Sequence, residues 1–259
     1  MGELFLLKYK KIGKILILDK NSPKTKDDKE YLESLLKKYN VESIVKVKSI
    51  SGQMREPSLE VLIGDTTETI HKENGCYFKL DLSKVMWAKG NNNERLRIAK
   101  LVGDGEVVCD MFAGIGYFTI PIAVLSKAKQ INAIEINPNS YKYLLENIKL
   151  NKINDKAGYM RVNPILGDCA NEIQNFLADR IIMGYVKTTH HYLKPAINSL
   201  KKGGILHYHE TVPEKLINTR PVERIREIAG SRKVTVLNIV KIKKYSPGVW
   251  HIVVDAKID

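Results

Sequence analysis

The sequence lacks the features that mark secreted, membrane-spanning and ATP-binding proteins. It has only three cysteines in 259 residues, and Cys76, Cys109 and Cys169 form no CxxC pair. Cysteines this far apart indicate neither a disulfide framework nor a zinc site. No stretch approaches the roughly 18 apolar residues of a membrane span, the N-terminus shows no signal-peptide cleavage pattern, and no P-loop motif is present. We therefore expect a cytoplasmic protein that binds neither metal nor membrane.

What the chain has in excess is positive charge. Lys and Arg total 42 against 29 Asp and Glu, a formal net charge of +13. A basic surplus spread through a folded chain of this size favours a polyanionic partner, most often RNA or DNA. The alternative is a lysine-rich composition of the thermophilic type, in which charged surface networks help at high temperature. Nothing in the sequence fixes the oligomeric state, for which a monomer is our expectation.

The first part of the chain, residues 1–88, has the pattern of a small α+β domain. Asn74-Gly75 separates two short apolar runs and predicts a tight hairpin, because both residues accept positive φ. Apolar residues at helical spacing predict one helix. The elements expected here are strands over 12–19, 41–50 and 58–63, a helix over 31–39, and hairpin strands over 66–70 and 76–80.

The second part, residues 89–259, alternates helices with apolar strands. This pattern indicates a mostly parallel sheet covered on both faces, a Rossmann-like α/β domain. Its last two strands, joined through Ser246-Pro247-Gly248, resemble an antiparallel hairpin at the sheet edge. The elements expected here are helices over 94–102, 117–126 and 139–151, and strands over 106–111, 130–136, 162–166, 179–183, 203–209, 234–242 and 249–257.

A glycine-containing loop, DMFAGIGYF over residues 110–118, follows the first strand of this second part. Gly114 and Gly116 let the backbone approach a ligand closely where the next helix begins. A dinucleotide fingerprint would need a third glycine, which is absent. Asp110 opens the loop and instead suits a cationic ligand, such as the amino group of S-adenosylmethionine (AdoMet). Phe112 in the same loop is a further cofactor-binding candidate.

Carboxylates also follow the next two strands. Glu135 lies 19 residues after Gly116, and a carboxylate there can accept hydrogen bonds from both hydroxyls of a ribose. Asp168 can accept a hydrogen bond from an adenine amino group. Ile136 and Cys169, which directly follow these two carboxylates, complete the cofactor-binding candidates.

Each of these residues also has an ordinary structural explanation. Asp110 or Asp168 alone is a helix cap, Glu135 alone is a surface carboxylate, and the two glycines alone are a tight turn. Together, however, they occupy three successive strand ends, which is where open α/β sheets bind ligands. The combination predicts a nucleoside-containing cofactor.

Several stretches resemble a known family. DMFAGIGYFTIPIA, AIEINPNSYKYLLENIKLNKI and ILGDCANEI resemble the AdoMet-binding motifs of the tRNA guanine-37 N1-methyltransferase superfamily. ADRIIMGYVKTTH, GGILHYHETVPEK and KIKKYSPGVWHIVVDAK resemble the wybutosine-synthesising aminocarboxypropyltransferases within it. The resemblance runs from about residue 12 to the C-terminus. It implies a class I AdoMet-dependent methyltransferase-like fold with a small N-terminal domain, AdoMet as the group donor, and tRNA as the macromolecular substrate.

The resemblance also implies a reaction. It is the transfer of the 3-amino-3-carboxypropyl group of AdoMet to C7 of 4-demethylwyosine at position 37 of tRNA-Phe, with release of 5′-methylthioadenosine. The N1-methyltransferases carry an Asn-x-Pro signature where this chain has Gly184 and Tyr185, which favours aminocarboxypropyl transfer. The alternatives are a tRNA guanine-37 N1-methyltransferase and a catalytically silent tRNA-binding protein that retains the AdoMet pocket.

The remaining roles have fewer candidates. Arg95 and Lys100, on the helix before the first strand, are candidates to bind the methionine carboxylate of AdoMet. The alternative is a solvated helix face, which is favoured for Lys100. His207, His209 and Glu210 alternate around the end of a strand, so a histidine with a neighbouring carboxylate is the predicted general base. The alternative for these histidines is a purely structural role.

A basic run near the C-terminus is the candidate RNA contact. Lys241, Lys243, Lys244 and Tyr245 alternate with apolar residues. The lysines can follow tRNA phosphates while the tyrosine stacks on a base. The alternative is an exposed strand edge protected from aggregation by lysine.

Overall fold

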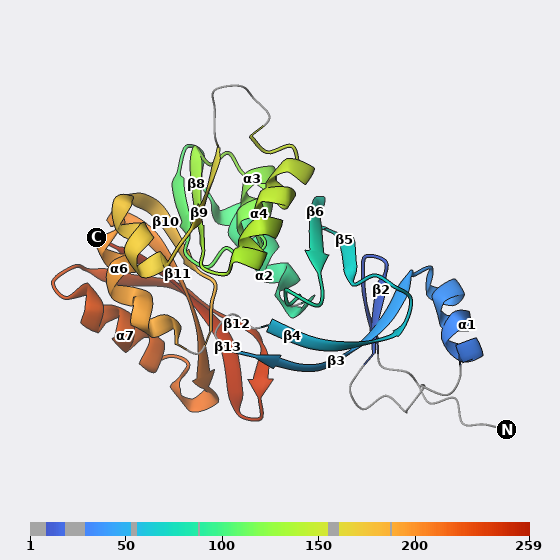
Figure 1. Cartoon of the computed structure of the whole chain (residues 1–259). Helices are drawn as coiled ribbons and strands as arrows, with labels where there is room; N and C mark the ends of the chain where they lie inside the picture. The colour runs from blue at the N-terminus through green and yellow to red at the C-terminus, as the bar shows by residue number, and fades with distance from the viewer. Residues whose placement is uncertain (1–8, 19–28, 53–55, 88, 155–160, 187) are drawn as a thin grey trace. The chain divides into compact units, whose positions relative to one another are not determined.

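The structure is a computed structural model that describes residues 9–18, 29–52, 56–87, 89–154, 161–186 and 188–259. The chain forms two compact units, Met1–Trp87 and Ala88–Asp259 (Figure 1). Each unit has its own sheet and its own buried core. No helix among the described residues is long and apolar enough to cross a membrane.

A four-stranded sheet, ordered β1-β2-β3-β4, forms the larger part of the first unit. Helix α1 (Lys29–Tyr39) covers it because apolar residues recur along one side of the helix, where Leu32 and Leu35 share a core with Leu16 and Ile44. The strands are β1 Tyr9–Ile12, β2 Ile15–Leu18, β3 Ser43–Ser51 and β4 Glu56–Ile63.

The predicted single strand over residues 12–19 is wrong for its first half. The chain reverses at Gly13, so that β1 and β2 pair as an antiparallel hairpin, and residue 19 lies outside the described part. Gly13 has a φ of 52°, and a Cβ there would overlap Thr69 and Ile70. The turn therefore requires glycine for both its conformation and its space.

The hairpin predicted at Asn74-Gly75 is confirmed. It joins β5 (Glu68–Glu73) to β6 (Cys76–Asp81), which pair antiparallel as a separate two-stranded sheet. Both turn residues have positive φ, 51° and 78°, as a tight two-residue hairpin loop requires.

The second unit contains a seven-stranded sheet in the order β12-β13-β11-β10-β7-β8-β9. The strands β7 to β11 run parallel, and β13 and then β12 are added antiparallel at one edge. The bounds are β7 Val107–Asp110, β8 Gln130–Glu135, β9 Val162–Leu166, β10 Ala178–Met183, β11 Leu200–Pro213, β12 Val234–Ser246 and β13 Val249–Ile258. The predicted edge hairpin is therefore confirmed.

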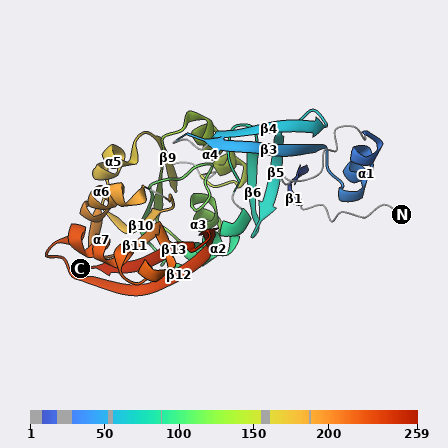
Figure 2. The same cartoon turned by 90° about the horizontal axis from the view of Figure 1, so that it is seen from below.

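Helices cover both faces of this sheet (Figures 1 and 2). Helices α5 to α7 bury an apolar face that includes Ile181 and Tyr208, whereas α2 and α3 cover a face with several polar side chains. The bounds are α2 Asn92–Leu101, α3 Thr119–Leu125, α4 Pro138–Leu150, α5 Cys169–Glu172, α6 Leu193–Asn198 and α7 Arg220–Ala229, with short 3₁₀ turns η1 Lys89–Asn91, η2 Ile173–Asn175, η3 Thr189–Tyr192 and η4 Glu214–Leu216.

The order of the parallel strands reverses between β7 and β10. From β7 the chain builds outward through β8 and β9, then returns to place β10 on the other side of β7. Ligands in open α/β sheets bind outside the carboxyl ends of the strands at such a switch point. The predicted class I, Rossmann-like α/β fold is thus confirmed, and the loops after β7, β8, β9 and β10 lie where such a fold binds its ligand.

Candidate active site

Asp110 ends β7 and holds the glycine-containing loop to the helix that follows. Its buried carboxylate accepts hydrogen bonds from Thr119 Oγ1 at 2.8 Å and from the Phe112 backbone N–H at 3.4 Å. Burial raises its pKa to about 6, against the opposing effect of the Thr119 hydrogen bond. The carboxylate thus lies buried beneath the loop, and its predicted contact with a cationic ligand stays a prediction.

The structure brings the loop glycines and Glu135 together, as the sequence predicts. Gly114 N–H donates to Glu135 Oε2 at 2.7 Å, and the glycine φ values are 58° at Gly114 and 99° at Gly116. A Cβ at Gly116 would lie 2.6 Å from the Ile120 side chain. The loop therefore lies against α3, with its backbone fixed by a carboxylate from the neighbouring strand.

Glu135 retains acceptor capacity for a ligand. Its Oε1 accepts from the Asn137 backbone N–H at 2.7 Å, so each carboxylate oxygen has a backbone donor. Burial raises its pKa, and these backbone hydrogen bonds oppose the rise. The Ile136 backbone N–H is a third donor to this carboxylate, and because two carboxylate oxygens carry four lone pairs, an acceptor site remains for a ribose hydroxyl. The next residue, Ile136, is 44% exposed at the surface of the strand end.

Asp168 is a helix cap, the ordinary explanation considered for it. Its Oδ1 accepts from the Ala170 backbone N–H at 2.9 Å at the start of α5. The adjacent Cys169 is buried, and burial raises the pKa of its thiol to about 12. Burial likewise raises the pKa of Cys109 well above its usual value. Neither thiol is therefore a nucleophile near neutral pH.

An aromatic cluster lies at the ends of β7 and β10. Phe112 stacks on Tyr185, with ring centroids 5.3 Å apart at 25°, and meets Tyr192 edge-on at 5.2 Å. Burial raises the pKa of Tyr192, and Cys169 and Asp168 raise it further, so the cluster extends toward the loop after β9. Tyr192 was missed in the sequence because η3, which positions it, has no periodic pattern.

Arg95 reaches the same loop from α2. The side chain is almost fully buried, and its guanidinium lies 5.3 Å from the ring centroid of Tyr117. Lys100, further along the same helix, is exposed. Arg95 therefore lies beside the loop residues, whereas Lys100 does not.

His207, on β11, belongs to a buried polar network on the α2 side of the sheet. Its Nδ1 lies 2.6 Å from Asp255 Oδ1, and its Nε2 lies 2.7 Å from Arg180 Nη1. Asp255 and Arg180 in turn pair with Arg97 and Glu106. Both ring nitrogens of His207 are therefore engaged, as in the structural alternative considered for it.

Glu210 is engaged on the opposite face of β11. Its Oε1 accepts from Arg220 Nε and Arg224 Nη1, each at 2.8 Å, and its Oε2 accepts from Tyr208 Oη at 2.8 Å. Its side chain is 1% exposed. The two arginines hold this carboxylate inside the fold, and the sequence could not show them because they come from α7.

His209 differs from the other two predicted catalytic residues. Its Nδ1 lies 3.0 Å from His251 Nε2, whereas its buried Nε2 has no hydrogen-bond partner in the described part of the chain. The ring meets Phe118 edge-on at 5.4 Å. Burial lowers its pKa well below the usual value, and the neighbouring His251 lowers it further.

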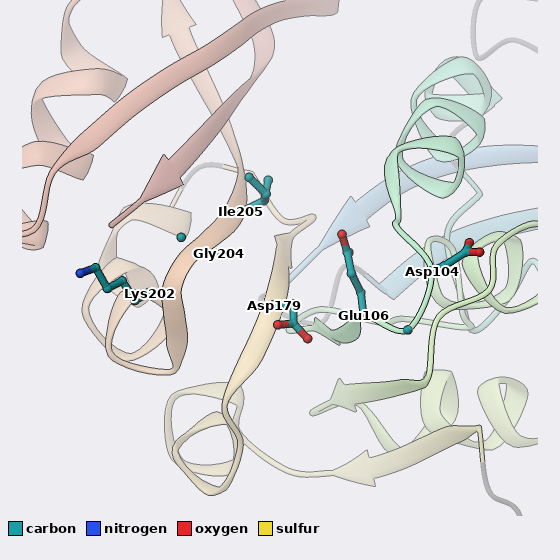
Figure 3. A pocket seen from close by; sticks show the side chains of 8 residues that line it. Asp104, Glu106, Asp179, Lys202, Gly204 and Ile205 are labelled. Atoms are coloured by element: carbon teal, nitrogen blue, oxygen red, sulfur yellow. The ribbon is translucent and has the colours of Figure 1, made fainter.

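A surface hollow of about 300 Å³ lies elsewhere, at the amino ends of the strands (Figure 3). Glu106 and Asp179, beside the starts of β7 and β10, line it together with Lys202 and Gly204. Both carboxylates already have partners, since Glu106 pairs with Arg180 and Asp179 with Lys201. None of the predicted site residues lines this hollow. No group of three possible metal ligands occurs among the residues described.

The sheet order, the glycine loop and the carboxylate after β8 define a class I AdoMet-dependent transferase. A family model for the TRM5/TYW2 methyltransferase domain matches residues 69–237, and a model for the TYW2 N-terminal domain matches residues 2–67. The chain belongs to the TRM5/TYW2 family.

Relatives within that family match almost the whole chain. The tRNA(Phe) (4-demethylwyosine(37)-C(7)) aminocarboxypropyltransferase of Methanocaldococcus jannaschii is 47% identical over 256 residues, 98% of each chain. The structure of M. jannaschii TYW2 in complex with AdoMet has a TM-score of 0.78 at 44% identity, covering 97% of this chain and 99% of the other. Pyrococcus horikoshii TYW2 in complex with MeSAdo has a TM-score of 0.82 at 39% identity, covering 97% and 90%.

Proposed function

We propose that the chain transfers the 3-amino-3-carboxypropyl group of AdoMet to C7 of 4-demethylwyosine at position 37 of tRNA-Phe. The observation that carries this is the match to an aminocarboxypropyltransferase over 98% of both chains. The site agrees with it, because the loops at the sheet's switch point offer a nucleoside-binding carboxylate beside a close-approach loop.

The donor site that we propose lies around the loop of residues 110–118. Glu135 binds the ribose through its remaining acceptor capacity, while Gly114 and Gly116 allow close approach of the backbone. Asp168 binds the adenine amino group, and Arg95 binds the methionine carboxylate. Asp110 acts beneath the loop by fixing its shape. Phe112, Ile136 and Cys169 supply apolar surface to the same site.

The chain's task in this reaction is orientation. Bound AdoMet supplies an electrophilic γ-carbon: a bond forms between it and C7, its bond to sulfur breaks with the electron pair kept by sulfur, and C7 then loses its proton. The methyl carbon of the same sulfonium is less hindered, so the site must direct the γ-carbon toward the acceptor. Orientation of this kind can be worth roughly 7–11 kcal/mol.

Among the predicted base candidates, His209 is the one we retain as the proton acceptor. His207 and Glu210 have their polar side-chain atoms in hydrogen bonds and we assign them to positioning. The Nε2 of His209 has no such partner among the described residues, and its lowered pKa makes it a weak base.

The tRNA contact that we propose is a lysine–tryptophan patch made by Lys241, Lys244 and Trp250. A β-bulge at Ile242 shifts the register of β12, so that both lysines come to the face of Trp250. Their Nζ atoms lie 4.9 Å and 5.7 Å from its ring centroid. The ring orients the two ammonium groups without neutralising them. Lys241 also pairs with a carboxylate, Glu214 at 3.4 Å. Two such charges suit adjacent phosphates of RNA.

The nucleoside released from AdoMet tests this function. Incubation with tRNA carrying 4-demethylwyosine should yield 5′-methylthioadenosine. Release of S-adenosylhomocysteine, with unmodified guanine-37 tRNA as the better substrate, would instead identify an N1-methyltransferase. Tight tRNA binding without either product would identify the catalytically silent alternative.

A further inference from the structure

Gly184, directly after β10, has no space for a side chain. A Cβ there would lie 2.7 Å from Cε2 and 3.0 Å from Cδ2 of Phe118. Its φ is not in the left-handed region, so the backbone conformation itself does not call for glycine. The requirement at this position therefore comes from the Phe118 ring alone.

The Phe118 ring cannot move aside to make space. Its side chain is 4% exposed, and its ring meets His209 edge-on at 5.4 Å. His209 is fully buried and contacts His251 of the next strand, β13, at 3.0 Å. The ring thus packs against two buried histidines that contact each other. It cannot shift to relieve a clash as the free end of a flexible side chain can.

Phe118 and Gly184 connect the two loops that flank the switch point. One loop is 111–118 after β7, and the other begins at Gly184 after β10. The Met111 backbone N–H donates to Ile182 O at 3.0 Å at their base, and further out Phe112 stacks on Tyr185. The Phe118–Gly184 contact is thus the point at which side-chain volume sets the separation of the loops.

We infer that Gly184 is a positioning residue for group transfer, because its missing side chain lets Phe118 set the distance between these two loops. This inference rests on the proposed function. Carbon atoms in contact settle near 3.5–4.0 Å apart, so a methyl group at position 184 must open the loops by about 1 Å. A misplacement of that size can lower a rate by about 100-fold.

The test compares Gly184→Ala, Phe118→Leu and the double variant on tRNA carrying 4-demethylwyosine. We expect Gly184→Ala to lower single-turnover transfer by tenfold or more while the AdoMet Kd changes less than about threefold. Phe118→Leu removes the ring atoms that the new methyl would meet. Adding Gly184→Ala in the Phe118→Leu background should therefore cost little further activity, even where Gly184→Ala alone folds poorly.

A matched control separates this contact from a general effect of replacing glycine. At Gly103 a Cβ would meet the Glu106 side chain, with Oε1 nearest at 2.9 Å, at the amino ends of the strands rather than at the loops, so Gly103→Ala should transfer at the wild-type rate. Wild-type turnover by Gly184→Ala, or equal losses from it in both backgrounds, would overturn the inference. Absence of methylthioadenosine from the wild-type protein would instead overturn the proposed function.

Discussion

His207 and Asp255 form a hydrogen bond of 2.6 Å that helps to fix the tautomer of the histidine. Arginine has only donors, so Arg180 Nη1, which lies 2.7 Å from His207 Nε2, must donate to it. The proton of a neutral His207 is therefore on Nδ1 and points at Asp255. This arrangement ties β10, β11 and β13 together, and through Arg97 it extends to α2.

The buried histidines make the fold sensitive to mild acid. Burial lowers the pKa of His207, and of His209 further, below the ordinary value of 6.5. The unfolded chain therefore takes up these protons first, and stability present above pH 6.5 is lost as the pH falls. We expect the melting temperature to drop between pH 7 and pH 5, by about 2–4 °C for each kcal/mol lost.

Asp255 adds a second loss of stability at lower pH. Burial alone would raise its pKa, but the hydrogen bonds from His207 and Arg97 lower it to about 2. Its contribution is therefore complete above about pH 4 and disappears toward pH 2.

His209→Phe tests the histidine effect, because it removes one buried titrating ring. The melting temperature of this variant should fall less steeply between pH 7 and pH 5 than that of the wild type. A melting temperature that stays level from pH 7 to pH 4 would contradict this account.

Glu135→Ala should weaken AdoMet binding by about ten- to a hundredfold, because one hydrogen bond to a charged group contributes roughly 1.5–3 kcal/mol. Calorimetric titration measures the affinity, and circular dichroism checks that the variant remains folded. Glu146→Ala, which removes a carboxylate of α4 paired with Lys142, is the control and should bind as the wild type does. Unchanged affinity of Glu135→Ala would remove this residue from the ribose site.

His209→Ala should slow transfer more than it weakens binding, by about 100-fold if the ring accepts the C7 proton. Single-turnover rates and AdoMet affinity together measure the two effects. His209→Phe keeps a ring beneath Phe118 but has no basic nitrogen, so it separates proton transfer from support. A rate for His209→Phe close to that of the wild type would show that His209 supports the loops and is not the base.

Replacing Lys241 and Lys244 by Gln should weaken tRNA binding and reduce its dependence on salt. Two lost phosphate contacts lower the slope of log K against log salt by about 1.5–2. The control replaces Lys127 and Lys142, each paired with a carboxylate on the same unit. Equal slopes for the two double variants would show that the lysines of β12 do not contact tRNA phosphates and instead protect an exposed strand edge.

Local patterns in the sequence predicted the elements that surround the site. The strands β7 to β10 and helix α4 lie within a few residues of their expected positions, because their apolar runs are long and bounded by turn residues. The meeting of Gly114 with Glu135 followed from parallel strands ending at one edge of the sheet.

What the sequence could not show depends on contacts between distant residues. The partners of His207 include Asp255, 48 positions away, and those of Glu210 include two arginines of α7, a helix that we did not expect. The short α6 was missed as well, since its six residues are too few to establish a period. The Phe118–Gly184 contact likewise has no signal in either segment alone.

The most direct test of the proposed reaction follows two carbons of AdoMet separately. Wild-type protein is incubated with tRNA carrying 4-demethylwyosine and AdoMet labelled either in the carboxyl carbon or in the methyl carbon. Transfer of the aminocarboxypropyl group predicts that the carboxyl label enters the tRNA while the methyl label leaves in the released nucleoside. Methyl label in the tRNA, with the carboxyl label left in solution, would contradict the account.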